Sequence, residues 1–146
     1  MAYFCGWVFP SLIFKMKKTS PSDTKVLLVD DEPNILLALE FLLQREGYRV
    51  EKAFNGVQAL EILPVMRPDI VVLDVMMPGM DGFEVARNIR QQPEMERTKI
   101  IFLTAKGTPT DKMKGYDTGG EYYLIKPFDN TDFVQIIQEV AAYGWF

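Results

Sequence analysis

Short apolar runs recur along the chain and predict five β-strands. They occupy residues 25–29, 49–53, 69–73, 99–103 and 121–125. Within three of them, at 26–29, 70–73 and 100–103, apolar and polar residues do not alternate. We therefore expect three strands that are covered on both faces, as in a parallel sheet.

Stretches with helical periodicity separate these runs. They cover residues 34–46, 56–64, 82–92, 110–118 and 130–142. Gly47 and Gly119 are expected to end the first and fourth helices, and Pro64 the second. Strict alternation of five strands and five helices predicts an α/β fold, a doubly wound parallel sheet with right-handed crossovers.

The length of 146 residues suits one domain with a core of its own. Residues 19–24 have the composition of a linker. We therefore predict a disordered or loosely packed extension and linker over residues 1–24, and one domain over residues 25–146.

The apolar segment at residues 1–14 is too short to span a bilayer, and its lysines follow it, whereas those of a secretory signal come first. We favour an extension from an upstream start codon, with Met16 as the natural start. A weak contact with a membrane or a partner is the alternative.

The formal net charge of −4 disfavours direct nucleic-acid binding, which needs clustered basic residues. The single cysteine, Cys5, excludes an intrachain disulfide and favours a reducing, cytoplasmic compartment. The chain has no histidine, which excludes a Ser-His-Asp triad, a histidine-ligated metal and a phosphohistidine on this chain.

Chemically useful residues follow four of the predicted strands. They are Asp30 and Asp31 after the first, Asp74 after the third, Thr104 at the fourth and Lys126 after the fifth. One polar residue at a strand end is ordinary, because strand ends meet water. Ligands of such sheets bind beyond the carboxyl ends of the strands, so the set together indicates a site.

The three carboxylates would repel one another and need a cation. Oxygen ligands without histidine or cysteine favour Mg²⁺, with Mn²⁺ as a second candidate. Asp74 is expected to be a nucleophile that accepts a phosphoryl group. Lys126 would neutralise the phosphoryl oxygens, and the Thr104 hydroxyl would bond to one of them.

The residues around Asp74 and Thr104 suit the acceptance of a phosphoryl group. Ala105, which follows Thr104, has almost no side chain to obstruct that group. Gly79 and Gly82 permit tight backbone turns, and Asp81 is expected to cap the next helix.

The segments VLLVDDEP, VVLDVMMPGMDGFE, IIFLTAK and YLIKPF, in this order and spacing, resemble the receiver domain of two-component response regulators. The resemblance covers about residues 25–142 and implies a flavodoxin-like sheet with strand order 2-1-3-4-5. By position, it implies that Asp30 and Asp31 are the acidic metal pair and that Asp74 is the phosphoacceptor. The backbone carbonyl of Met76 would be a further metal ligand.

The resemblance also implies roles around the fifth strand. Thr104 matches the switch hydroxyl, Tyr123 the switch aromatic and Lys126 the phosphate-binding lysine. The bond between Lys126 and Pro127 is expected to be cis.

The implied activity is Mg²⁺-dependent transfer from the phosphohistidine of a sensor histidine kinase or phosphotransfer protein, followed by hydrolysis. The domain would thus catalyse its own phosphorylation and dephosphorylation, although it is not a conventional enzyme. Phosphorylation would shift the surface of the fourth helix, fifth strand and fifth helix between two packings and signal to an output protein.

Some positions depart from the family pattern. Residues 127–146 contain no lysine or arginine, and Tyr122 stands where an acid is frequent. These departures argue against the charge-paired dimer of winged-helix regulators, so we expect a monomer or a weak dimer. Met76 and Lys106 occupy positions that tune phosphoryl lifetime in the family.

Two other site types fit less well. A haloacid-dehalogenase-type phosphatase needs a second acid two residues after the nucleophile, where this chain has Met76. A flavodoxin-like nucleotide site needs a glycine- or hydroxyl-rich loop after the first strand, where this chain has DDEP. For output, we expect a stand-alone receiver; a receiver fragment of a larger multidomain regulator or hybrid kinase is the alternative.

Overall fold

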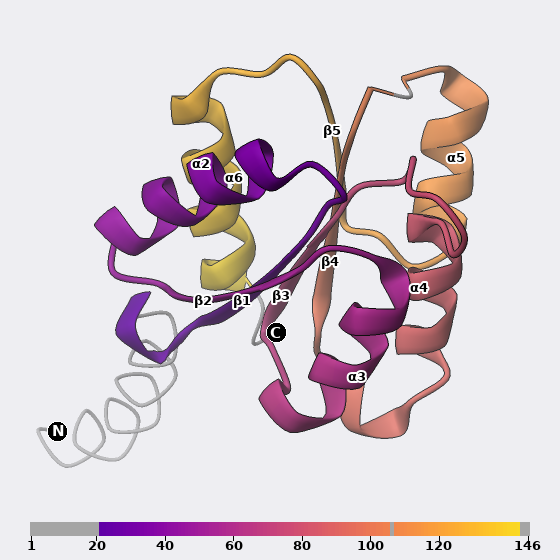
Figure 1. Ribbon diagram of the computed structural model, residues 1–146, viewed down its shortest axis with the longest axis horizontal. Coiled ribbons are helices and arrows are strands. Elements are labelled where there is room, and N and C mark those ends of the chain that lie inside the picture. The colour runs from indigo at the N-terminus through magenta and orange to yellow at the C-terminus, as the bar shows by residue number, and fades with distance from the viewer. Residues whose placement is uncertain (1–20, 106, 144–146) are drawn as a thin grey trace, which may run out of the picture.

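The computed structural model describes residues 21–105 and 107–143. Five parallel strands form one sheet in the order β2-β1-β3-β4-β5, which confirms the predicted topology (Figure 1). The strands are β1 (Lys25–Val29), β2 (Arg49–Ala53), β3 (Ile70–Leu73), β4 (Lys99–Thr104) and β5 (Tyr122–Ile125). The predictions for residues 1–20 lie outside the described residues.

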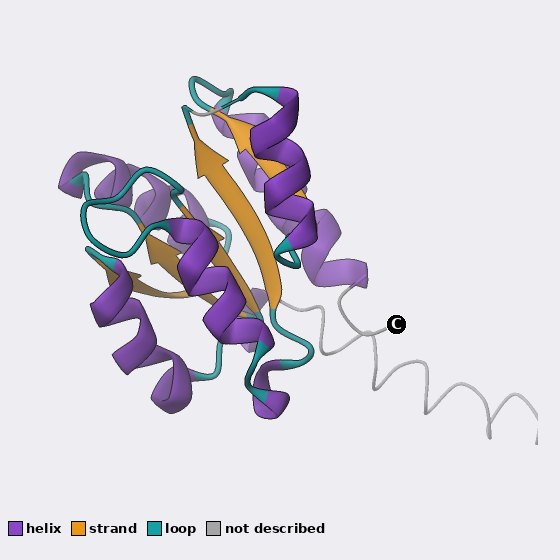
Figure 2. Cartoon of the chain, turned by 90° about the vertical axis from the view of Figure 1, so that its right-hand side faces the viewer, coloured by secondary structure: helices purple, strands orange, loops and turns teal. Residues whose placement is uncertain are grey.

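Helices cover both faces of the sheet (Figures 1 and 2). They are α2 (Pro33–Arg45), α3 (Gly56–Met66), α4 (Gly82–Arg90), α5 (Pro109–Asp117) and α6 (Asn130–Tyr143). Two short 3₁₀ helices, η1 (Pro21–Asp23) and η2 (Pro93–Met95), were not predicted. Gly47 and Gly119 follow the ends of α2 and α5, as expected.

Alternate residues of each central strand enter two separate cores. Leu27 and Val71 pack towards α3 and α4, whereas Val26 and Val72 pack towards α2 and α6. All four side chains are at most 2% exposed. This double burial is why β1, β3 and β4 have continuous apolar runs without polar alternation.

The prediction that Pro64 ends its helix is wrong. Helix α3 continues through Pro64 to Met66, and Arg67 ends it in the left-handed conformation, with φ of 48°. The Arg67 N–H bonds to the Leu63 carbonyl at 2.9 Å, and the Leu63 side chain is fully buried. Burial of Leu63 and this closing hydrogen bond stabilise the last turn, although proline removes one donor.

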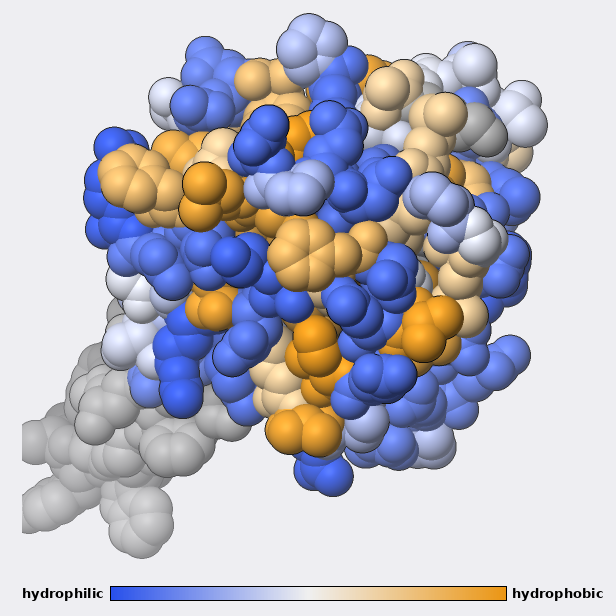
Figure 3. Space-filling model, in the orientation of Figure 1, coloured by the Kyte–Doolittle hydropathy of each residue, from blue (hydrophilic) through white to orange (hydrophobic). Residues whose placement is uncertain are grey.

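The face seen in Figure 3 exposes hydrophobic side chains between hydrophilic ones. Exposed apolar residues on α2, on α3 and in the loop between β2 and α3 are Leu37, Phe41, Phe54, Val57 and Val65.

Among residues 21–105 and 107–143, no helix has the length and apolar character needed to cross a bilayer.

Candidate functional site

The fold brings the predicted site residues to one edge of the sheet. Asp30 and Asp74 directly follow the neighbouring strands β1 and β3, while Thr104 ends β4 and Lys126 follows β5. The connections reverse direction between β1 and β3, and open α/β sheets bind ligands at such a point.

The three acids form a compact cluster. A carboxylate oxygen of each of Asp30, Asp31 and Asp74 lies within 4.8 Å of one from each of the others. Asp30 is 2% exposed and Asp74 4% exposed, whereas Asp31 is open to solvent. The cluster therefore has two recessed acids and one at the surface.

Lys126 supplies the positive charge that the recessed acids need. Its Nζ lies 2.8 Å from Asp30 Oδ2 and 3.6 Å from Asp74 Oδ2. Burial alone would lower the Lys126 pKa, but the hydrogen bond to Asp30 and the charges of Asp74 and Asp30 raise it overall. The side chain is therefore a cation at neutral pH.

The pKa of Asp74 is raised above the ordinary 3.8, first by burial and then by the negative charge of Asp30. The charge of Lys126 and hydrogen bonds from the Met76 N–H and the Thr104 side chain act in the opposite direction. The Met76 N–H lies 3.2 Å from Asp74 Oδ1. Burial and the charge of Asp30 thus disfavour the ionised form of Asp74, and added positive charge nearby would lower its pKa.

A family model for the response regulator receiver domain matches residues 26–138. The chain belongs to this family.

Solved receiver structures agree. The Vibrio cholerae chemotaxis protein CheY4 is 37% identical, with a TM-score of 0.77 over 80% of this chain and 98% of that one. A putative response regulator from Chloroflexus aurantiacus is 34% identical, with a TM-score of 0.77 over 82% and 98%. The receiver domain of the Pseudomonas aeruginosa sensor histidine kinase PA1611 is 33% identical, with a TM-score of 0.74 over 81% and 97%, and has a magnesium ion coordinated in its active-site cleft.

The acids of this receiver fit such an ion. Three carboxylates supply hard oxygen ligands, and they lie close enough together to share one cation. Receiver domains bind Mg²⁺ in their acidic site, and the donor set here is of that kind. Metal binding by the Met76 backbone carbonyl stays a prediction. The Met76 side chain is 55% exposed.

The loop after Asp74 packs tightly against the Asp74 backbone. A Cβ at Gly82 would collide with the Asp74 carbonyl, so only glycine lets α4 begin there. Gly79 has φ of 76°. Asp81 caps α4 as predicted, because its Oδ1 accepts the Glu84 N–H at 2.9 Å.

Tyr123 belongs to β5, and its ring packs against β4 and α5. It is 9% exposed, its ring centroid lies 5.8 Å from that of Phe102, and a Cβ at Gly115 would lie 2.7 Å from its Cδ2. Burial, followed by the charges of Asp111 and Asp74, raises the pKa of Tyr123 to about 12.

The Lys126–Pro127 bond is cis, as the resemblance implied. Lys106 lies outside the described residues.

Sequence reasoning missed an apolar rim beside the acids. A hollow there is lined by Asp31, Phe54 and Val57, together with Pro78 and Met80. The sequence carried a signal: the large apolar Phe54 directly precedes the turn-forming pair Asn55 and Gly56, in a segment where a loop is expected.

Proposed function

We propose that Asp74 accepts a phosphoryl group from the phosphohistidine of a sensor histidine kinase or a phosphotransfer protein. The supporting observation is the pairing of a recessed carboxylate with a lysine Nζ 3.6 Å away and two further acids suited to a cation. That arrangement assembles positive charge where a transferred phosphoryl group would develop negative charge.

In the transfer, an Asp74 oxygen attacks phosphorus. Its electron pair forms the O–P bond, and the electrons of the P–N bond leave with the donor imidazole. Lys126, the Met76 N–H and the Thr104 hydroxyl favour the carboxylate form of Asp74 that attacks. Lys126 and Thr104 then bind oxygens of the transferred group, and the small side chain of Ala105 leaves room for them.

The acids Asp30, Asp31 and Asp74 would hold Mg²⁺, or Mn²⁺ in its place, and the Met76 carbonyl would complete the protein ligands. A bound divalent cation supplies charge neutralisation for the phosphoryl oxygens. Water later attacks the acyl phosphate of Asp74, which returns the carboxylate and releases inorganic phosphate.

The signal would leave through α5, β5 and α6. Gly115 is the buried residue of α5, whereas α4 buries five residues: Gly82, Phe83, Val85, Ala86 and Ile89. If a phosphoryl group attracts Thr104, α5 would therefore shift more easily than α4, because fewer of its residues are buried. Movement of Tyr123 would pass the change to the surface.

We further propose that the output is contact with a protein partner, by a monomer or a weak dimer. Residues 127–146 carry no lysine or arginine, so α6 lacks the basic partners of a charge-paired dimer. The Tyr122 hydroxyl lies 3.1 Å from Glu139 Oε2, which joins β5 to α6 within one molecule.

Incubation with Mg²⁺ and phosphoramidate, followed by intact-protein mass spectrometry, tests the proposal. Wild type should gain one phosphoryl group, and Asp74→Asn should gain none. Asp117→Asn, an exposed acid at the end of α5, is the matched control and should behave as wild type.

Chelation of divalent cations should suppress the wild-type gain. The proposal fails if wild type remains unmodified with Mg²⁺ present, or if Asp74→Asn is modified equally.

A further inference from the structure

The phosphoacceptor is recessed. Asp74 is 4% exposed and Asp30 2% exposed, while the neighbouring Asp31 is open to solvent. A donor imidazole must therefore enter the edge of the sheet to reach Asp74, and the protein surface around that imidazole must lie on the rim. What lines the rim then bears on which donor surface fits.

One side of this rim is apolar. Next to Asp31 is a hollow of about 470 Å³ between the β2–α3 loop and the β3–α4 loop. The Phe54 side chain is 43% exposed and that of Val57 57% exposed, and Met80 is half-buried beside them. Single exposed apolar residues are ordinary, but here they share one hollow with an acid of the site.

The rim is held in place by hydrogen bonds. The Phe54 N–H donates to Gln58 Oε1 at 2.8 Å, and the Gln58 N–H donates to Asn55 Oδ1 at 2.8 Å. These two bonds, both made by Gln58, fix the backbone around Asn55, the N-cap of α3. Phe54 is therefore presented on a turn that need not be ordered on binding.

The two loops are also packed together. A Cβ at Gly56 would lie 2.9 Å from the Met80 Cβ, so the start of α3 and the loop after β3 are in close contact. Because that loop also carries Met76, whose N–H bonds to Asp74, the rim and the phosphoacceptor are positioned by one packed unit.

We propose that Phe54, Val57 and Met80 form a docking rim for the histidine-containing phosphodonor protein, and that this donor presents an apolar side chain next to its phosphohistidine. This inference rests on the proposed function. The occupant follows from continuity, because Asp31 belongs both to the acidic cluster and to the lining of the hollow. A donor residue on this rim would be buried as the imidazole enters.

The test compares a small phosphodonor with protein phosphodonors. The variant Phe54→Ser/Val57→Ser removes apolar surface without touching the core. Val65→Ser, on the same helix as Val57 and 87% exposed but outside the hollow, is the matched control. Each protein is labelled with phosphoramidate and with a panel of autophosphorylated sensor kinases from the source organism.

The double variant should keep the wild-type rate with phosphoramidate and lose about tenfold in kcat/KM with every kinase that labels wild type, equivalent to about 1.4 kcal/mol. Val65→Ser should match wild type with both donors. Retention of the wild-type kinase rate by the double variant would overturn the docking rim and leave the phosphoacceptor assignment intact.

Other results are equally decisive. If the double variant changes only the sedimentation behaviour of the protein, the rim contacts a second copy and the inference is wrong. Absence of labelling by phosphoramidate itself would instead contradict the proposed function.

Discussion

The two edges of the sheet treat charge in opposite ways. At the carboxyl edge, Lys126 pairs with the buried carboxylates of Asp30 and Asp74, and three acids share a small space. At the amino edge, charged side chains bond mainly to the backbone. The charges of the amino edge join distant segments of the chain, whereas those of the carboxyl edge are gathered around one lysine.

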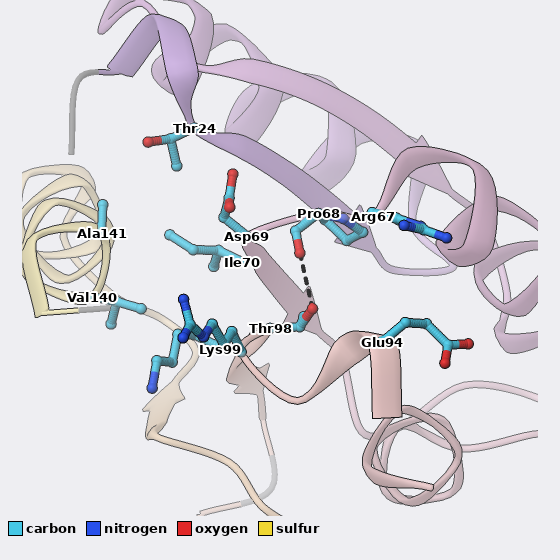
Figure 4. A pocket seen from close by; sticks show the side chains of 11 residues that line it. Thr24, Arg67, Pro68, Asp69, Ile70, Glu94, Thr98, Lys99, Val140 and Ala141 are labelled. Atoms are coloured by element: carbon cyan, nitrogen blue, oxygen red, sulfur yellow. Dashed lines mark hydrogen bonds between the residues drawn. The ribbon is translucent and has the colours of Figure 1, made fainter. Parts of the chain in front are cut away.

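The amino edge is shown in Figure 4. Asp69 Oδ2 accepts the Lys25 N–H at 2.8 Å, and Lys25 Nζ donates to the Met66 carbonyl at 2.8 Å. The Thr98 hydroxyl donates to the Pro68 carbonyl at 3.0 Å, the dashed line of Figure 4. Each of these contacts joins chain segments that are distant in sequence.

Arg90 is the centre of a second such network. Its guanidinium donates to the Thr98 carbonyl at 2.8 Å and to the Gly119 carbonyl at 2.6 Å, and it pairs with Glu121 at 3.2 Å. Glu121 in turn accepts the Ile100 N–H at 2.6 Å. The amino edge therefore satisfies its backbone groups with charged side chains, whereas the carboxyl edge brings three acids and one lysine together.

The largest expected effect contrasts two lysines. Lys126→Met should lower the free energy of unfolding by about 2–4 kcal/mol at neutral pH, because two buried carboxylates lose their counter-charge. Lys25→Met, which loses a bond to one carbonyl, should cost about 1 kcal/mol. Urea denaturation of both variants measures the difference.

Adding Asp74→Asn to Lys126→Met should recover part of the loss, since one buried charge is then removed. Equal destabilisation by the two lysine substitutions would show that the carboxyl edge tolerates its acids without Lys126.

The next effect lies at the amino edge. Arg90→Ala should lower the free energy of unfolding by about 2 kcal/mol, because two backbone carbonyls and Glu121 lose a charged donor. Phosphoramidate labelling should be unchanged at a temperature where the variant is folded. Arg87→Ala, exposed on the same helix, is the control and should be near neutral. A strong loss of labelling in folded Arg90→Ala would contradict the view that the amino edge affects stability without affecting labelling.

The smallest effect has the opposite sign. The raised pKa of Asp74 means that the folded state binds its proton more readily than the unfolded state. Preferential protonation of Asp74 in the folded state therefore stabilises the protein below the ordinary pKa of 3.8. This contribution is lost as the pH rises through the pKa of Asp74 in the folded state.

Asp74→Asn should therefore be more stable than wild type at pH 7, by about 1 kcal/mol. The gain should disappear near pH 3, where Asp74 is protonated in both states. Thermal unfolding at the two pH values tests this, and a gain that is larger in acid would contradict the sign.

The carboxyl edge was largely predictable from the sequence, because its residues directly follow continuous apolar strands. Parallel topology then brings Asp30, Asp74 and Lys126 together whatever the details of packing. The end of α3 was mispredicted at Pro64, because tertiary burial of Leu63 outweighs a local proline signal.

The amino edge was not predictable in the same way. Arg90 reaches Gly119 and Glu121, which are 29 and 31 residues away, and nothing local to Arg90 specifies them. The apolar rim was missed for a related reason: Phe54 and Met80 become neighbours only when two loops pack at Gly56.

The shallow anchoring of α5 has an evolutionary consequence. Since Gly115 is its buried residue, the outward side chains of this helix can be exchanged with little cost to folding. Met113, at 66% exposed, and Tyr116, at 51% exposed, are two such positions. Under the proposed function, substitutions at these exposed positions would change which partner is recognised while the residues around Asp74 stay the same.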